Sequence, residues 1–400
     1  MTKSILFVAI DYPPRPGPGA NRNYYLHKHF SDSSWKSYVL AAKKSSHAVL
    51  DSSFKELDGV LHAGGKDATK VLSLFGKYPK FIEIPDRWYL WILPAFFKGR
   101  KHLKDNSTSF IYASFPTYSS AIVGALLSKF TKVPLILDLR DPFRFRYDPD
   151  NVPAHWLYKL LERFVIKQTK ILITTTNECA ALYKALYPRL NKAKVFTIPN
   201  GFSADFHHSI RNSLNKKRGQ EPFTLLHSGN LYQIGRDPSV LLLAIYQLVQ
   251  LQIIKAGSFK LVFRGASPWL ALEKQIEKLH LNEFIEFKPN LSYEESIQEM
   301  YSADVNLLIQ NDIFNLQIPS KLYDLVAIEK PFIAITNETG ALAKEMQRLK
   351  VGYYSEKEST LTEQIKRLLT TRITAKHTKC DQNLSREKIN ARLIETLTKL

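Results

Sequence analysis

The stretch that decides the fold is QIPSKLYDLVAIEKPFIAI, residues 317–335. It predicts a helix that begins near Pro319 and Ser320 and that ends before Pro331, followed by the strand FIAI. A helix start carries partial positive charge and favours acidic side chains, so Lys321 in the first turn is electrostatically unfavourable. A lysine in this place requires a negatively charged partner elsewhere.

Short apolar, β-branched runs alternate with longer amphipathic stretches on both sides of this segment, which is typical of βαβ units with parallel sheets. The predicted strands form two sets on either side of the polar, basic stretch 211–222. They are SILFVAI, SYVLAA, SFIYAS, PLILDL and ILITTT in the first set, and FTLLHSG, FKLVFRG, FIEFKP, VNLLIQ and PFIAIT in the second. Each set predicts a doubly wound α/β domain, which binds ligands at the carboxyl ends of its strands.

The composition is that of an ordinary globular chain and excludes the disordered and fibrous classes: 44% of the 400 residues are hydrophobic and 23% are charged. Cys179 and Cys380 lie far apart and form neither a disulfide framework nor a metal spacing, so we expect a reducing, cytoplasmic location. No stretch reaches the roughly 18 apolar residues of a membrane span.

The net charge of +19 is unevenly distributed. Residues 1–200 hold 30 basic against 15 acidic side chains, whereas residues 201–400 hold 26 against 22. Nucleic acid, an anionic membrane surface and an acidic substrate all suit a basic half, and a solubilising surface explains it equally well.

The second set of strands contains a further cation that could bind the same anion as Lys321. There the first strand is followed by Gly229, a loop with Arg236, and a predicted helix start at Asp237-Pro238. In a doubly wound sheet both helix starts lie on one edge, so Arg236 and Lys321 converge, and a diphosphate bound there offsets the cost of the lysine. Asp324 would then reach a sugar hydroxyl beside it. The alternative is an exposed Lys321 in an ion pair with Asp324.

The first predicted strand leads into a second loop of interest, DYPPRPGPGANRNYYL, in which Gly17 and Gly19 precede a helix. Glycines between a strand and a helix let backbone N–H groups approach an anion. The spacing matches neither the dinucleotide fingerprint nor the Walker sequence, so a plain turn is the alternative.

These motifs together resemble glycosyltransferase family four. PSKLYDLVAIEKPFIAI is similar to the PSKxxEYxAxGKPVI helix of that family, and the further matching segments are DYPPRPGPGANRNYYL, IYASFPTYSSAIVGALL, VPLILDLRDPF, VFTIPNGFSADF and LHSGNLYQIGRDP. The resemblance implies the GT-B fold: two Rossmann-like, doubly wound parallel-sheet domains facing a central cleft. The acceptor domain would span 1–205, joined by a C-terminal helix at 383–400, and the donor domain would span 206–382.

The resemblance also implies roles for individual residues. Arg236 and Lys321 would be the catalytic pair that grips the diphosphate of a nucleotide sugar. The other donor-binding residues would be Gly17, Gly19, Asn230 and Asp324, and the residues toward the acceptor would be Arg140, Asp141 and Arg22.

The chain departs from the family pattern at three places. The paired glutamates of the family fall on Leu316 and Asp324, so one carboxylate is absent and the other is shorter. Asn230 stands where an arginine usually follows the glycine, and Arg236 would replace that arginine. Arg140-Asp141 stands where many relatives have His-Asp.

The resulting expectation is a glycosyltransferase that transfers a sugar from a nucleoside-diphosphate sugar to a glycan or lipid-linked acceptor. It would act with retention, without metal or other cofactor, in cell-surface polysaccharide or glycolipid biosynthesis. The alternatives are a sugar-nucleotide epimerase or hydrolase of the same fold, and a non-catalytic basic scaffold for membrane or nucleic acid.

The stretch 85–104, PDRWYLWILPAFFKGRKHLK, mixes aromatic and basic residues. Peripheral contact with an anionic membrane would use Trp88, Trp91, Phe96 and Phe97 as apolar anchors beneath the basic side chains. The alternatives are a buried core with a solvated basic face, and binding of single-stranded nucleic acid, which we expect least.

Overall fold

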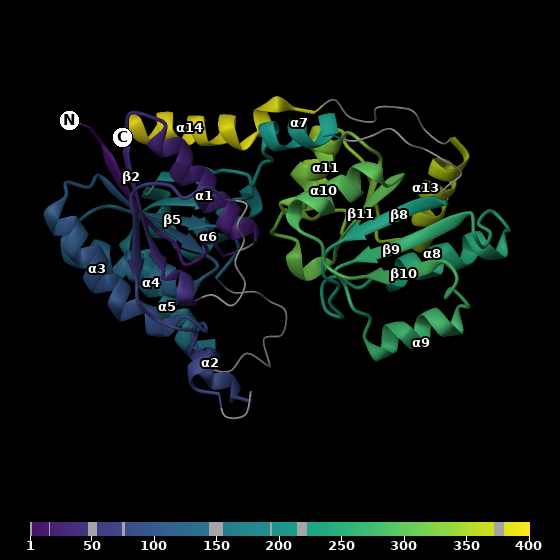
Figure 1. Cartoon of the computed structure of the whole chain (residues 1–400), viewed down its shortest axis with the longest axis horizontal. Coiled ribbons are helices and arrows are strands. Elements are labelled where there is room, and N and C mark those ends of the chain that lie inside the picture. Colours follow the sequence, from purple (N-terminus) through teal and green to yellow (C-terminus); the bar gives the residue numbers. More distant parts are fainter. Residues whose placement is uncertain are drawn as a thin grey trace. The chain divides into compact units, whose positions relative to one another are not determined.

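This computed structural model describes residues 2–15, 17–46, 54–73, 77–143, 155–192, 194–213, 222–371 and 380–400. The chain forms two compact units (Figure 1): unit 1 comprises Met1–Asn200 with Glu387–Leu400, and unit 2 comprises Gly201–Arg386. The stretch expected to separate the two sets of strands, 211–222, lies largely outside the described residues.

Unit 1 contains a seven-stranded, fully parallel sheet in the order β3-β2-β1-β4-β5-β6-β7. The order reverses between β1 and β4, and this switch point is where doubly wound sheets bind ligands. The strands are β1 (Ser4–Val8), β2 (Lys36–Ala42), β3 (Val60–Ala63), β4 (Phe110–Phe115), β5 (Leu135–Leu139), β6 (Thr169–Thr174) and β7 (Lys194–Thr197). The helices are α1 (Pro18–Ser31), α2 (Ala68–Val71), α3 (Ile92–Asp105), α4 (Tyr118–Thr131), α5 (His155–Gln168), α6 (Asn177–Leu186) and α14 (Arg386–Thr398).

Alternating side chains of β1 divide the core of unit 1 into two layers. Leu6 and Val8 pack with α3 and α4 on one face, whereas Ile5 and Phe7 pack with α1 and α14 on the other. Along α14 the apolar residues recur at helical spacing and cover this second face; they are Ile389, Leu393 and Leu397.

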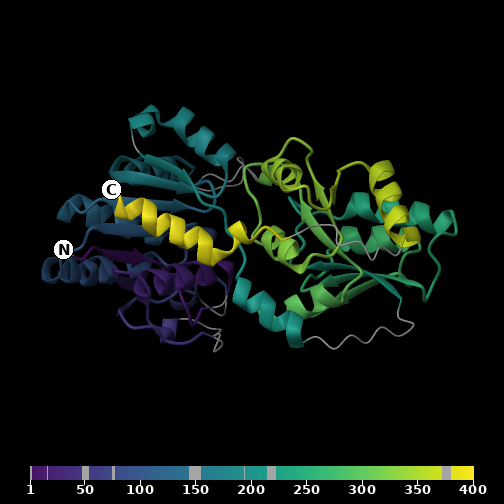
Figure 2. The same cartoon turned by 90° about the horizontal axis from the view of Figure 1, so that it is seen from above.

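The two ends of the chain lie at the same end of unit 1, as both views show (Figures 1 and 2). The Nζ of Lys3 donates to the carbonyl oxygen of Thr398 at 2.7 Å, and its ammonium lies over the ring of Trp35. A cation at a helix C-terminus satisfies free carbonyl groups, so Lys3 fastens the end of α14.

Unit 2 contains a six-stranded parallel sheet in the order β10-β9-β8-β11-β12-β13, which reverses between β8 and β11. The strands are β8 (Phe223–Ser228), β9 (Phe259–Arg264), β10 (Ile285–Lys288), β11 (Val305–Gln310), β12 (Phe332–Thr336) and β13 (Tyr353–Tyr354). The helices are α7 (Ala204–Ser213), α8 (Ser239–Gln250), α9 (Leu270–Lys278), α10 (Tyr293–Ser302), α11 (Lys321–Ile328), α12 (Ala341–Leu349) and α13 (Glu358–Thr371). Helices α8, α9 and α13 cover one face, and α7, α10, α11 and α12 cover the other.

The two doubly wound sheets confirm the predicted fold class, and every predicted strand is present. The helix predicted between Pro319 and Pro331 is α11, and Lys321 is its first residue. Ser320 precedes the helix but makes no side-chain capping hydrogen bond, and the helix ends at Glu329 in the left-handed conformation. The sequence pattern did not predict the short strands β3, β7 and β13.

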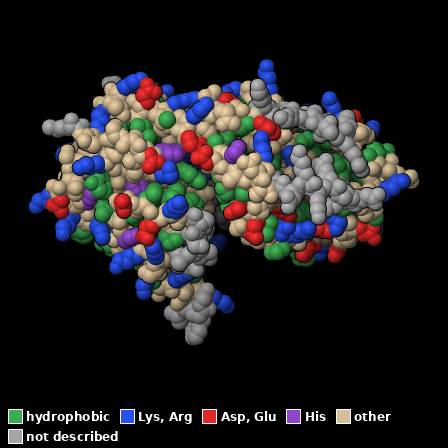
Figure 3. Space-filling view, turned by 45° about the horizontal axis from the view of Figure 1, so that its top comes forward, with side chains coloured by type: hydrophobic (Ala, Val, Ile, Leu, Met, Phe, Trp, Pro, Cys, Tyr) green, Lys and Arg blue, Asp and Glu red, His purple; other side chains and the backbone are tan. Residues whose placement is uncertain are grey.

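Lys and Arg side chains are scattered over the face of the molecule shown in Figure 3, without forming one continuous basic patch there. Within the described parts of the chain, no helix is long and apolar enough to cross a lipid bilayer.

The packing of α14 makes a prediction about stability. Leu393 is 2% exposed in the core that Ile5 and Phe7 share. We expect Leu393→Ala to lower the free energy of unfolding of unit 1 by about 2–5 kcal/mol, because it leaves a cavity beside the sheet. Denaturant unfolding would measure the change. Glu395→Ala, on the exposed side of the same helix, serves as the control and should cost less than about 1 kcal/mol. Equal losses in the two variants would contradict this account of α14.

Candidate anion-binding site

Two loops meet at the switch point of the unit 2 sheet. One follows β8 and the other follows β11, the neighbouring strand. The amide N–H of Asn311 donates to the carbonyl oxygen of Gly235 at 2.9 Å, and the amide of Asp237 donates to Oδ1 of Asn311 at 3.0 Å. Gly235 has φ +96°, and a Cβ there would clash with Ile313 and Phe314. The two loops are therefore locked together, and glycine is required at their contact.

Lys321 projects from the start of α11 back toward the end of β8. A Cβ at Gly229, which has φ +135°, would clash with the Nζ of Lys321, so the ammonium lies directly against that glycine. The pKa of Lys321 is lowered to about 8. Burial and the positive charge of Arg236 lower it, whereas the negative charge of Asp324 raises it. The fold therefore brings Arg236 and Lys321 together, as predicted from the topology.

Arg236 is positioned by aromatic rings instead of by a carboxylate. Its guanidinium carbon lies 5.2 Å from the ring centre of Tyr232 and 5.7 Å from that of Phe314. Its backbone pairs with Tyr232 in an isolated antiparallel bridge. Stacking on aromatic faces orients the guanidinium and leaves its N–H donors available.

Neither cation is neutralised within the described residues: no acidic side chain forms an ion pair or hydrogen bond with Lys321 or Arg236. His227, at the end of β8, adds no positive charge, because burial and these two cations lower its pKa to about 3. The edge thus carries two adjacent positive charges above a neutral, buried floor. Such an arrangement binds an anion with more than one negative oxygen.

Asp324 is buried and serves a hydrogen-bond network on α7, α10 and α11. Its Oδ1 accepts from the hydroxyl of Tyr293 at 2.9 Å and lies 3.1 Å from Nε2 of His207. The other ring nitrogen of His207 lies 3.2 Å from the hydroxyl of Tyr301. The alternative of an exposed Lys321 paired with Asp324 is therefore not realised, because this carboxylate is engaged with the histidine and the tyrosine.

His207 is a residue that the sequence analysis did not single out. It is 4% exposed and lies 117 positions from Asp324 in the chain. No spacing rule connects two side chains that far apart, so only the fold reveals the contact.

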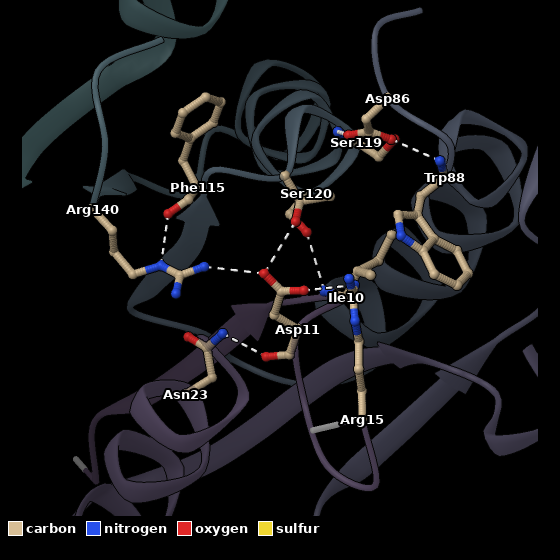
Figure 4. A network of polar contacts seen from close by, with 11 residues as sticks. Ile10, Asp11, Arg15, Asn23, Asp86, Trp88, Phe115, Ser119, Ser120 and Arg140 are labelled. Carbon is tan, nitrogen blue, oxygen red and sulfur yellow. Dashed lines mark hydrogen bonds and ion pairs between the residues drawn. The ribbon is translucent and has the colours of Figure 1, made fainter. Parts of the chain in front are cut away.

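Unit 1 has its own polar cluster at the carboxyl ends of β1, β4 and β5 (Figure 4). Asp11 forms ion pairs with Arg15 at 2.6 Å and with Arg140 at 3.1 Å. The Nε of Arg140 also donates to the carbonyl oxygen of Phe115 at 2.7 Å. A Cβ at Gly19 would lie 2.5 Å from Nη1 of Arg140, so the guanidinium lies directly against this glycine. Two arginines share one carboxylate, which leaves this cluster less positive than the pair in unit 2.

Arg22, expected near the acceptor, is buried in unit 1. Its Nε and Nη2 donate to the two carboxylate oxygens of Asp138 at 2.9 and 3.1 Å, and Nη1 donates to the carbonyl oxygen of Pro199 at 3.1 Å. All three nitrogens are engaged within the protein. We therefore assign Arg22 a structural role and remove it from the candidate site.

The remaining candidates lie near these two clusters. Gly17 has φ +124° at the start of α1, with open space around it, and Asp141 follows Arg140 after β5. Asn230 is exposed, and its amide donates to the hydroxyl of Tyr232 at 3.4 Å. Leu316 is half-buried in the loop before α11.

The aromatic stretch 85–104 requires a correction. Trp88 and Trp91 are 6% and 0% exposed within the core of unit 1, so the expectation that they anchor the protein in a membrane is wrong. Phe97 is 62% exposed and Phe96 is half-buried against it. The aromatic residues belong to the core in the first half of the stretch and to the surface in the second.

Across the described ranges no cluster of three or more His, Cys, Asp or Glu side chains could hold a metal ion. Both Cys179 and Cys380 are free thiols.

The comparisons with known proteins agree with this architecture. The structure is similar over 100% of both chains to Anabaena Alr3699/HepE in complex with UDP, with a TM-score of 0.68 at 16% identity. Sucrose-phosphate synthase from Thermosynechococcus elongatus matches with a TM-score of 0.67 at 13% identity, over 99% of this chain and 98% of that one. The UDP-GlcNAc 2-epimerase from Methanocaldococcus jannaschii matches over 100% of both chains, with a TM-score of 0.56 at 11% identity. The chain therefore has the GT-B fold.

The sequence itself matches one family. Residues 60–206 match the model of Glycosyltransferase Family 4, the family that the sequence motifs resemble. No curated protein matches the sequence.

The electrostatics of the site make a prediction that needs no ligand. Arg236→Gln should raise the pKa of Lys321 above about 8, because it removes a neighbouring positive charge. Asp324→Asn should lower the same pKa, because it removes a favourable negative charge. NMR titration of 13C-methylated lysine would follow both shifts. Two shifts of the same sign, or none, would show that Lys321 does not sense these groups.

Proposed function

We propose that this protein is a glycosyltransferase that moves a sugar from a nucleoside-diphosphate sugar to a hydroxyl of a glycan or lipid-linked acceptor. Its product would enter cell-surface polysaccharide or glycolipid biosynthesis. The observation that carries the proposal is the pair of unneutralised cations, Arg236 and Lys321, at the switch point of unit 2. The family match in unit 1 and the UDP bound to HepE both support it.

Departure of a nucleoside diphosphate builds negative charge on its phosphate oxygens. Two positive groups that are already in place when this charge develops stabilise the transition state without reorganisation. In this proposal Arg236 and Lys321 supply that stabilisation in place of a metal ion, and the sugar is transferred with retention. Positioning of the acceptor hydroxyl supplies the remainder of the rate enhancement.

Unit 2 is the donor domain in this proposal. Asp324, fixed by His207 and Tyr293, accepts a hydrogen bond from a sugar hydroxyl of the nucleotide. Unit 1 is the acceptor domain, to which Arg140, Asp141 and the loop of Gly17 and Gly19 contribute.

We further propose that the protein works in the cytoplasm, in peripheral contact with an anionic membrane. The supporting observation is a cluster of exposed apolar side chains on α3 and α4. Leu93 is 64% exposed, Phe97 is 62% and Phe130 is 56%. The exposed basic side chains beside them are Lys98, Arg100, Lys101 and Lys129. Apolar side chains with flanking bases suit the boundary between acyl chains and anionic headgroups.

The transferase proposal is tested by nucleotide binding. We expect Lys321→Ala and Arg236→Ala each to weaken the binding of UDP or another nucleoside diphosphate by about 10- to 100-fold, the value of one charged hydrogen bond. Isothermal titration calorimetry would measure this. Lys278→Ala removes an exposed lysine of α9 in the same unit and should change nothing. Wild-type affinity in both site variants would refute the assignment.

The pKa of Lys321 adds a second signature to this experiment. An anion bound beside the ammonium raises that pKa above about 8, so binding at pH 8 should take up a fraction of a proton, and binding at pH 6 should take up almost none. Calorimetry in two buffers of different ionisation enthalpy measures the uptake. Lys321→Ala should abolish it. With a nucleotide sugar as substrate, product analysis then separates transfer to an acceptor from epimerisation or hydrolysis.

The membrane proposal is tested by sedimentation with liposomes. We expect the wild-type protein to sediment with anionic vesicles and not with neutral ones. Leu93→Ser combined with Phe97→Ser should lower partitioning about tenfold or more, because two apolar side chains no longer enter the interface. Leu251→Ser, which removes an apolar side chain of unit 2 that is 62% exposed, is the control. Equal partitioning to both vesicle types would exclude the contact.

A further inference from the structure

A hollow lies in unit 1, at the amino edge of its sheet, where the strands begin. The candidate transferase residues of this unit lie at the opposite, carboxyl edge. The hollow has a volume of about 430 Å³, which falls within the usual range for small-molecule sites. Its lining residues come from the starts of β1, β4, β5, β6 and β7 and from the end of the chain: Lys3, Ser109, Phe110, Pro134, Lys170, Ile171, Lys194 and Leu400.

The charged side chains that line the hollow are all basic, and none of its described lining residues is Asp or Glu. Lys3 is fixed by its hydrogen bonds to the end of α14. Lys170 and Lys194 are exposed and form no ion pair with any described acidic residue. Three ammonium groups around one cavity give it the charge that an anion requires.

The backbone places Lys170 in an unusual way. Leu135 pairs with Thr169, but the next residue, Ile136, pairs with Ile171, so Lys170 is an extra residue in β6. Such a bulge redirects a side chain and is often found beside functional sites. On the other side of β6, Ile171 pairs with Lys194 of β7, which brings the second lysine to the same point of the edge.

The rest of the wall is apolar. Phe110 is 8% exposed and Ile171 is 2% exposed. Pro134 lies between the end of α4 and the start of β5. A free inorganic anion gains nothing from such a wall, whereas a phosphate attached to an apolar group gains from both halves of the site.

We propose that this hollow is a second ligand site, which binds a phosphate group carried on an apolar molecule, such as a lipid phosphate. It is separate from the proposed nucleotide site and does not rest on the transferase activity. Lys170 and Lys194 bind the phosphate oxygens, Lys3 completes the positive rim, and Phe110 with Ile171 contacts the apolar part.

The test uses calorimetry on the full chain with soluble, monomeric dihexanoyl phosphatidic acid. Dihexanoyl phosphatidylcholine and inorganic phosphate are the comparison ligands. We expect the phosphatidic acid to bind most tightly, and Lys170→Gln combined with Lys194→Gln to weaken it about tenfold or more. Lys66→Gln combined with Lys70→Gln removes the same charge from exposed positions after β3 and should leave the affinity unchanged. Thermal unfolding monitors the fold of both double variants.

Several results would overturn the proposal. Inorganic phosphate that binds as tightly as the phosphatidic acid would remove the role of the apolar wall, and phosphatidylcholine that binds as tightly would remove the role of the lysines. Equal losses in the two double variants would reduce the effect to net charge. A single-stranded oligonucleotide that binds in a Lys170- and Lys194-dependent way, in the absence of phosphatidic acid binding, would assign the edge to nucleic acid.

Discussion

The close placement of two cations, Lys321 and Arg236, is the constraint on which the candidate site of unit 2 depends. Both groups come from loops that follow adjacent strands, and the bonds between Gly235, Asp237 and Asn311 prevent those loops from separating. Burial, together with the charge of Arg236, therefore lowers the pKa of Lys321 to about 8. An anion with several negative oxygens would convert this unfavourable arrangement into a favourable one, which is the physical basis of the proposed diphosphate site.

In unit 1, by contrast, the arginines at the carboxyl edge of the sheet have carboxylate partners. Arg22 is fully engaged by Asp138 and Pro199, and Arg140 and Arg15 share Asp11. A buried or half-buried cation with a carboxylate partner has little left to offer a further anion. The same type of sheet thus carries an electrostatically satisfied edge in one unit and an unsatisfied edge in the other. This difference is the reason why we propose unit 2, and not unit 1, as the donor domain.

The sequence predicted the two-sheet architecture and the meeting of Arg236 with Lys321, because both follow from topology: neighbouring parallel strands end at one edge. The three strands that escaped prediction, β3, β7 and β13, all lie at sheet edges, where half-exposed side chains weaken the apolar pattern. Contacts between residues far apart in the sequence were not predicted either. The contact of His207 with Asp324 and the burial of Arg22 join residues more than 100 positions apart, and no local spacing encodes them. The prediction that Trp88 and Trp91 lie at the surface was wrong, because the composition of a segment does not say which of its side chains face the core.

Residues 201–386, which form unit 2, separate the two segments of unit 1 in the sequence. Helix α14 therefore completes the core of unit 1 only after all of unit 2 has been synthesised. During translation, Ile5, Phe7 and Phe30 on this side of the sheet are only partly covered, by α1, until Leu393 and Leu397 have been synthesised. Unit 2 holds its entire core in one continuous segment, residues 201–386. The core of unit 1 is therefore complete only when α14 has been made, although unit 1 contains the first residues of the chain.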